Sequence, residues 1–341
     1  MEVYNVPDKR RYWVVRADNC KYYEHFIRYG VIALGHLDQL NLRPINSQIS
    51  KRSYKSLDSS LKKLHEHQDI PSRSTSTQLN QAKTFINDMK VGDWVLTVGR
   101  SVIRFGRIIS DYRLDSKPLA IIHDHENDRK TVLEYQLRRK VSWGPSIRRD
   151  SLPYGLQASL KANQTIFNID HNWEAIYHSL YPVFCKGDTL YLSAKINTEQ
   201  RVKNYAVSTL LGFLNELEVI SKELDSGLKP DEFDDVFRKY VHSDQITITT
   251  KAGFHSPGEI WNAVEGNSKK SMLYLVLGYS MLFGNQTLGF DGLVDLETRQ
   301  KLWDIVIKRM DDKDINQVIN SLQLTAPDVK TNRLESSAND E

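Results

Sequence analysis

The sequence predicts an α+β protein that folds as two domains and ends in a disordered tail. The length of 341 residues, with 40% hydrophobic and 26% charged residues, suits two domains with separate cores. Residues 1–185 contain several short strand patterns with few helices between them, which predicts a mixed β-barrel with flanking helices. Residues 186–327 contain amphipathic helix patterns, which predict a mainly helical α+β domain. Residues 328–341 are polar and are predicted to be disordered.

The first elements of the barrel follow from runs of aromatic, β-branched and apolar residues. Residues 12–16 and 31–35 have strand composition, and the second run is bracketed by glycines. Between them, Tyr22 and Phe26 recur at helical spacing and predict a helix over residues 21–29. Residues 45–77 are polar and rich in serine and lysine, so we expect an insertion or mobile loop with a helix near 59–67.

Residues 84–112 predict the passage from a helix into the centre of the barrel. A helix over residues 78–89 leads to Gly92-Asp93, whose turn chemistry lets a helix end and a strand begin. Strands are then predicted at 94–98 and 103–109. The second strand contains Gly106, and a glycine inside a strand often marks a bulge or a close backbone approach.

The remaining predicted elements are mainly strands in the first domain and mainly helices in the second. A helix over residues 198–224 is predicted because apolar residues recur there at steps of three and four. The barrel is completed by strands at 118–123, 130–135 and 138–143 and a helix over 171–181. In the second domain we expect a strand at 245–250, a helical segment around Trp261, and helices over 271–283, 297–310 and 314–322.

The sequence also indicates the cellular compartment. The N-terminal segment is polar and has no signal-peptide pattern, and the apolar run 271–284 is shorter than the roughly 20 residues that span a membrane. Cys20 and Cys185 are far apart in sequence and have no metal-binding or redox spacing. We therefore expect a cytoplasmic protein with two unpaired thiols and no membrane partner.

Charge is distributed unevenly along the chain. Residues 1–150 contain 27 lysine and arginine residues against 17 acidic residues, a net charge of +10. The rest contains 19 basic and 26 acidic residues, a net charge of −7. A basic first half suggests contact with a polyanion, and a solvated basic face without a partner is the alternative.

Five sequence blocks of the first half occur in the order of a known family. They are YWVVRA, FIRYGVIALGHLDQL, QLNQAKTFINDMKVGDWVLT, GRIISDY and KVSWGPSIRRDSLPYGLQASLKANQTIFNI. Over residues 12–182 the chain thus resembles the EVE/PUA-like domains of bacterial restriction and defence proteins, which are related to YTH and ASCH domains. His36 departs from the pattern, because the family often has tryptophan at this place.

The resemblance implies a PUA-like barrel that holds a modified base in an aromatic cage. A base is accessible only outside the stack, and its faces then need aromatic or apolar walls. The candidates for this pocket are Trp13, Asp18, Asn19, Trp94, Tyr112 and Trp143. A tryptophan on a strand can equally be a core residue. The candidates for phosphate contacts are Arg104, Arg107, Arg138, Arg139, Lys140, Arg148 and Arg149, with exposed solubilising charges as the alternative.

Catalytic motifs are not supported by the sequence. Residues 247–251 offer the strand and the lysine of a PD-(D/E)xK nuclease, but threonine stands where the acid is needed. The pairs His65/His67 and His123/His125 lack an identifiable third metal ligand. Ser256 lies in a turn rather than at a nucleophile elbow. We therefore assign no catalytic residue, no metal and no cofactor.

Three functional hypotheses remain. The first is a nucleic-acid-binding protein, DNA rather than RNA, that recognises a modified or flipped base in bacterial restriction or anti-phage defence. In this hypothesis the second domain recruits a partner nuclease or mediates self-association. The second is a metal-dependent nuclease or other enzyme with its site in the second domain, near residues 231–235 or 245–258. A charged helix N-terminus also explains those acids. The third is an RNA-binding PUA-like protein.

Overall fold

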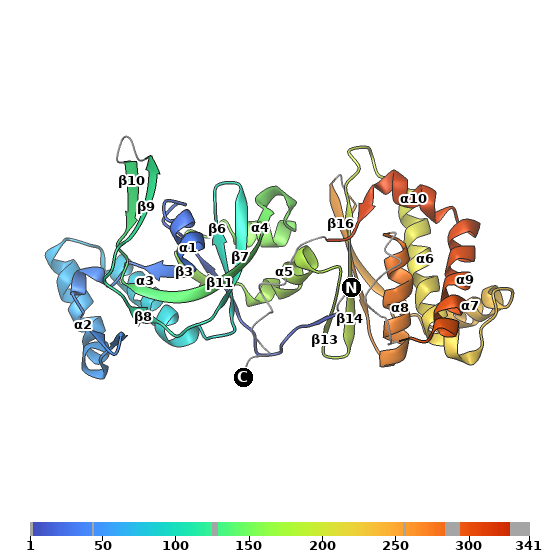
Figure 1. Ribbon diagram of the computed structural model, residues 1–341, viewed down its shortest axis with the longest axis horizontal. Coiled ribbons are helices and arrows are strands. Elements are labelled where there is room, and N and C mark those ends of the chain that lie inside the picture. Colours follow the sequence, from blue (N-terminus) through green and yellow to red (C-terminus); the bar gives the residue numbers. More distant parts are fainter. Residues whose placement is uncertain (1–2, 43, 125–128, 255–256, 284–293, 328–341) are drawn as a thin grey trace. The chain divides into compact units, whose positions relative to one another are not determined.

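The computed structural model describes residues 3–42, 44–124, 129–254, 257–283 and 294–327 of an α+β chain (Figure 1). The chain divides into two compact units. The N-terminal unit comprises residues 9–175, and the C-terminal unit comprises residues 3–8 and 176–327 within the described part. The division falls earlier than the predicted boundary at 185/186, because residues 176–185 join the sheet and core of the C-terminal unit. The predicted tail, 328–341, lies outside the described residues.

A curled seven-stranded sheet forms the centre of the N-terminal unit, with the strand order β12-β2-β6-β7-β11-β3 and β8 beside β11. β2 and β6 are parallel, and the other pairs are antiparallel. The sheet curls because β11 is long: its first residues pair with β3 and its later residues with β7. The strands are β2 (Tyr12–Val15), β3 (Val31–Leu34), β6 (Trp94–Val98), β7 (Val102–Ile108), β8 (Arg113–Leu114), β11 (Leu137–Arg148) and β12 (Ile166–Asn168).

The Gly92-Asp93 turn at the start of β6 is held by the Asp93 carboxylate. Gly92 has a φ of 93°, which favours glycine. The buried Asp93 carboxylate accepts hydrogen bonds from the Lys90 backbone N–H at 2.9 Å and from the Trp13 indole N–H at 2.9 Å. One acidic side chain therefore closes the turn and ties β6 to β2.

Helices and two hairpins surround this sheet. The predicted insertion at 45–77 is an ordered helical pair, α2 and α3, which corrects the expectation of a mobile loop. α2 begins at Ser50, whose side chain accepts a hydrogen bond from the Ser53 N–H at 3.0 Å. The elements are α1 (Tyr23–Tyr29), η1 (Asp38–Leu40), α2 (Lys51–His67), α3 (Ser72–Lys83), the π-helical turn η2 (Thr84–Asp88), η3 (Arg149–Ser151), α4 (Tyr154–Ser159) and η4 (Asp170–Asn172). The hairpins are β4–β5 (Pro44–Ile45, Gln48–Ile49) and β9–β10 (Leu119–Asp124, Arg129–Leu133).

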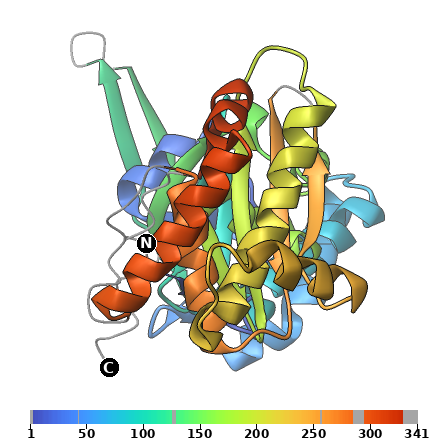
Figure 2. The same cartoon turned by 90° about the vertical axis from the view of Figure 1, so that its right-hand side faces the viewer.

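The C-terminal unit is a six-stranded sheet with most of its helices on one face (Figure 2). On the other face, His178 stacks on Trp261 with 4.6 Å between ring centroids. The order is β1-β13-β14-β16-β15, with β17 beside β14. The strands are β1 (Tyr4–Asn5), β13 (Val183–Lys186), β14 (Thr189–Ile196), β15 (Thr249–Gly253), β16 (Gly258–Val264) and β17 (Leu324–Thr325). The helices are α5 (Trp173–Leu180), which crosses the division between the units, α6 (Asn204–Glu223), η5 (Leu224–Ser226), α7 (Phe233–His242), α8 (Lys269–Met281), α9 (Leu296–Asp312) and α10 (Ile315–Leu322).

Two predictions for this unit were wrong. Trp261 lies on strand β16 and not in a helical segment, because alternate residues of β16 face the helical core. β13 and β14 were not predicted, so the unit has more sheet than expected. The long helix α6 is confirmed. Among the described residues, no helix is long and apolar enough to cross a membrane.

Candidate functional site

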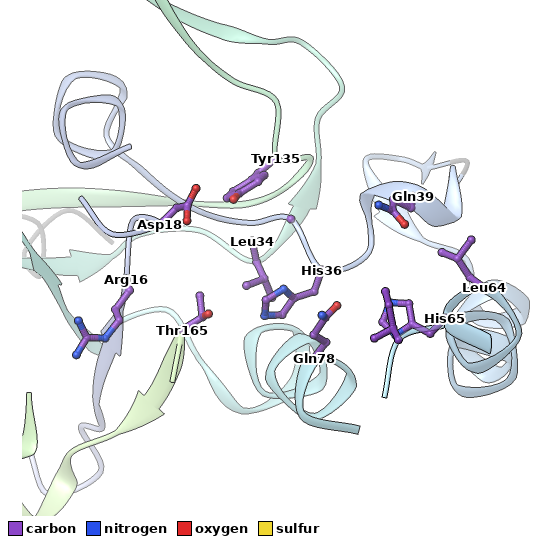
Figure 3. A pocket seen from close by; sticks show the side chains of 12 residues that line it. Arg16, Asp18, Leu34, His36, Gln39, Leu64, His65, Gln78, Tyr135 and Thr165 are labelled. Carbon is purple, nitrogen blue, oxygen red and sulfur yellow. The ribbon is translucent and has the colours of Figure 1, made fainter. Parts of the chain in front are cut away.

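A cavity of about 280 Å³ opens in the N-terminal unit where the end of β3 meets helices α2 and α3 (Figure 3). Its size lies just below the range of roughly 300–1,000 Å³ that is typical of small-molecule sites. The lining mixes apolar walls with polar groups. The residues are Arg16, Asp18, Leu34, Gly35, His36, Gln39, Leu64, His65, Ile70, Gln78, Tyr135 and Thr165.

Tyr135 provides the flat wall of this cavity. Its ring lies so close to the Gly35 backbone that a Cβ at Gly35 would stand 2.5 Å from the ring carbon Cδ1. Tyr22 packs edge-on against the same ring, with 5.1 Å between centroids. Burial, assisted by the nearby acids Asp18 and Asp38, raises the pKa of Tyr135 to about 12. The phenol is therefore neutral and can donate a hydrogen bond.

Asp18 reaches the cavity from a loop with an uncommon backbone. Asp18, Asn19 and Cys20 have φ values of 47°, 49° and 71°, three consecutive residues in the left-handed region. Each such residue costs roughly 1–2 kcal/mol, and strained backbone concentrates at functional sites. The Lys21 N–H donates to the Asp18 carbonyl at 2.8 Å and closes the turn. Figure 3 shows the Asp18 carboxylate beside the hydroxyl end of Tyr135.

Two histidines line the opposite side of the cavity. His36 Nε2 lies 2.7 Å from Gln81 Oε1 and donates to it, so a neutral imidazole keeps Nδ1 as an acceptor. Burial, followed by the proximity of His65, lowers the pKa of His36. His65 Nδ1 lies 2.8 Å from the Thr75 hydroxyl and links α2 to α3. His36 is therefore neutral at neutral pH, and His65 is held in one orientation.

Arg16 marks the end of the cavity near β12. Its Nη2 donates to the carbonyl of Ala162 at 2.8 Å, while Nε is buried without a hydrogen-bond partner in the described structure. Burial, together with Arg149, lowers the pKa of Arg16. This donor at the rim completes a polar set of one carboxylate, one arginine, two histidines and two glutamines.

Most of the predicted aromatic cage is core. Trp94 is fully buried, and Trp143 is 7% exposed, with its indole N–H donating to the Phe26 carbonyl at 2.6 Å. Tyr112 is half-buried, packs against the core and lines none of the described cavities near the site. Asn19 is exposed and does not line the cavity. Of the predicted pocket residues, Asp18 alone lies in this cavity.

Trp13 lines a second, wider hollow on the other side of helix α3. This hollow of about 530 Å³ also contains Gln81 and Phe167. The Arg11 guanidinium lies 4.5 Å from the centre of the Trp13 ring. Trp13 is only 3% exposed, and Asp93 satisfies its indole N–H, so its main role is structural.

The predicted phosphate-binding pair Arg138 and Arg139 is buried, which corrects its assignment to a binding surface. Arg139 donates from Nε to the Phe85 carbonyl at 2.9 Å and from Nη1 to the Ser110 carbonyl at 3.1 Å, and so holds the η2 turn. Arg138 Nε donates to the Tyr135 carbonyl at 2.6 Å. Burial lowers the pKa of both arginines. Their hydrogen bonds hold the η2 turn and the backbone at Tyr135.

The other predicted phosphate contacts differ in exposure. Lys140, Arg148 and Arg149 are exposed, but Arg148 forms an ion pair with Asp150 through Nε at 3.0 Å. Arg104 is half-buried and donates to the Gly144 carbonyl at 2.9 Å, and Arg107 is 9% exposed. These residues remain predictions, and they line neither the cavity nor the second hollow.

The acidic cluster of the C-terminal unit is occupied by ion pairs. Asp231 lies 2.8 Å from Lys308, and Asp234 lies 3.1 Å from Arg309. Glu232 and Asp235 pair with Lys229 and Arg238 at 3.7 and 3.3 Å. Within the described ranges, no group of three or more histidine, cysteine or acidic residues is arranged to hold a metal ion.

The two predicted histidine pairs do not present their rings together as metal ligands within the described residues. His65 and His67 lie on helix α2, where residues two apart face different directions, so His65 is buried and His67 exposed. His123 lies 2.9 Å from the Thr131 hydroxyl. His125 and Ser256 lie outside the described residues. Cys20 and Cys185 are free thiols, as predicted.

Sequence reasoning missed most of the cavity. Gln39, Gln78 and Tyr135 belong to no sequence motif. Tyr135 meets Gly35 only in the folded chain, because the two residues are far apart in sequence. His36 carried a signal: it stands where the resembled family often has tryptophan, and it lies in the cavity.

Comparison with known proteins gives one match. No curated protein and no solved structure matches the chain. Residues 13–170, which cover most of the N-terminal unit, match the model of a family described as a domain of unknown function, DUF8426.

Proposed function

We propose that this protein binds nucleic acid and takes one unstacked, modified base into the cavity beside Tyr135. The observation that carries the proposal is the cavity itself, which puts a flat aromatic wall next to Asp18 and His36. A flipped base needs a flat face to stack on and polar groups that bind its edge. A volume of about 280 Å³ suits one ring system.

The polar lining favours a base with an exocyclic amino group. Asp18 is an acceptor-only carboxylate, and His36 keeps Nδ1 as an acceptor because Nε2 donates to Gln81. Adenine and cytosine offer amino N–H donors at their edges. N6-methyladenine, 5-methylcytosine and 5-hydroxymethylcytosine are therefore the modified bases to test first.

The sequence resemblance supports the biological setting of this proposal. EVE/PUA-like domains hold modified bases, so the curled sheet of the N-terminal unit is proposed to be a PUA-like barrel, with DNA as the ligand in bacterial restriction or anti-phage defence. RNA is the alternative ligand.

Binding of labelled oligonucleotides tests the proposal. Single- and double-stranded DNA and RNA, with and without the three modified bases, should bind the full chain with different affinities. Tyr135→Ala should weaken binding of the preferred base about ten- to hundredfold, because stacking contributes about 1–3 kcal/mol per base. Tyr135→Phe should keep most of the affinity, because it keeps the wall.

The control is Tyr154→Ala, which removes a tyrosine that is 79% exposed and lies outside the cavity. It should leave affinity unchanged. Equal binding of modified and unmodified oligonucleotides, or a Tyr135→Ala variant that folds and binds like the wild type, would contradict the proposal.

A further inference from the structure

Helix α2 lines the cavity and also carries exposed basic charge. Because Arg138 and Arg139 are buried, a polyanion can meet only the exposed basic residues of this unit. α2 has exposed basic side chains over three turns, namely Lys51, Arg52, Lys55, Lys62 and Lys63. From Arg52 to Lys63 the helix rises about 16 Å, a length that faces several successive phosphates.

The opposite face of the same helix packs on the protein. Leu57, Leu61 and His65 recur at four-residue steps and are buried. Figure 3 shows Leu64 and His65 at the cavity, and Lys62 and Lys63 precede them directly in α2. α2 therefore lines the cavity with one face and carries exposed basic side chains on another.

α2 carries two acidic residues, Asp58 and Glu66, against its five lysine and arginine residues. The acid Asp58 is already paired with Lys83 at 2.8 Å. Within the described chain, no ion pair joins Arg52, Lys55, Lys62 or Lys63 to an acidic residue. When unpaired lysine and arginine side chains bind a phosphate backbone, the counterions condensed on the nucleic acid are released, and this release favours binding.

We propose that α2 is the phosphate-binding element of this protein. The backbone of a single nucleic-acid strand lies along Arg52, Lys55, Lys62 and Lys63 while one of its bases enters the cavity. This inference rests on the proposed function and adds the path of the strand. It assigns the phosphate contacts to a helix that the sequence suggested was an insertion.

Charge variants on α2 test the path. Lys62→Glu/Lys63→Glu should weaken binding of a single-stranded oligonucleotide about tenfold or more at 0.1 M salt. Arg52→Gln/Lys55→Gln, at the other end of the helix, should have a smaller effect in the same direction. The slope of log affinity against log salt should fall by about 0.7 for each lost contact. The preference for the modified base should not change, because the cavity lining is intact.

The matched control is Lys203→Glu/Lys239→Glu, which makes the same charge change at exposed positions of the C-terminal unit. It should bind like the wild type. If the wild type prefers a modified base but the α2 variants keep its affinity and salt slope, the α2 path is wrong and the cavity proposal stands. If the wild type binds no oligonucleotide, both fail, and the α2 surface then fits an acidic protein partner instead.

Discussion

The pKa of the Asp38 carboxyl group is shifted by its surroundings in the N-terminal unit. Its carboxylate accepts a hydrogen bond from the Gln136 N–H at 3.1 Å, in the segment that carries Tyr135. Burial raises its pKa from 3.8 to about 6, although this hydrogen bond and Arg138 act in the opposite direction. A carboxyl group with a raised pKa binds its proton more tightly in the folded state than in the unfolded state.

Asp38 should therefore make stability depend on pH in a defined window. Its stabilising contribution is complete below about pH 4 and is lost as the pH rises through about 6. Asp38→Asn keeps an acceptor for Gln136 and removes the titration. Relative to the wild type, the variant should become more stable between pH 4 and 6, as measured by urea unfolding. Parallel stability curves would refute this assignment.

The sequence could predict which residue types form the site but not which of them are buried. Adjacent arginines on a strand have the composition of a phosphate-binding surface, yet the Arg139 guanidinium donates to carbonyls from two other segments. Those carbonyls come from residues far away in sequence, so no local pattern reveals them. Asp18 was predicted as a residue that could bind a base edge, and it lines the cavity.

At the scale of elements, Gly106 explains how β7 packs against β11. A Cβ at Gly106 would stand 2.5 Å from a ring atom of Trp143 and 2.5 Å from a methyl group of Val141. The predicted close approach at this glycine is therefore confirmed. Trp143 fills the space that a side chain would occupy, which fixes its indole against Phe26.

Alanine substitution at two glycines should have opposite effects. Gly106→Ala should destabilise the N-terminal unit by about 1–3 kcal/mol, because extra volume in a packed core forces neighbouring side chains to move. Gly212→Ala, on helix α6 with no neighbouring atom within 4 Å of the added carbon, should stabilise the C-terminal unit by up to about 1 kcal/mol. Urea unfolding measures both. A neutral Gly106→Ala variant would show that the interface between β7 and β11 can relax.

Elements with a strong local pattern were predicted, and those fixed by distant contacts were not. The long helix α6 and the strands β6 and β7 have clear local sequence patterns. A short helical segment was expected around Trp261, where the structure has strand β16. So short a segment fits either structure until the strands beside it, β14 and β15, are known.

At the scale of the whole molecule, the start of the chain belongs to the C-terminal unit. β1 pairs in parallel with β13, and the Val6 N–H donates to the Cys185 carbonyl at 2.8 Å. Tyr4 stacks on Tyr181 with 4.8 Å between ring centroids. The two units are therefore not simply consecutive in sequence.

Removing the Tyr4 ring should weaken one unit and spare the other. Tyr4→Ala should lower the stability of the C-terminal unit by about 1–2 kcal/mol, because it deletes stacked aromatic contacts. Hydrogen exchange should then be faster in β13 and unchanged in β6. The control Tyr205→Ala removes a ring that is 66% exposed and should change neither. Equal acceleration in both strands would mean that the units unfold together.

The β1–β13 pairing also sets an order of events on the ribosome. At about 5–20 residues per second, Phe184 is synthesised roughly 9–36 s after its partner Tyr4. The whole N-terminal unit is made within that interval, while β1 has no strand to join. A nascent chain that stops before Val183 would carry all residues of the N-terminal unit and an unpaired first strand, so the sheet of the C-terminal unit can include its first strand only after β13 has been made.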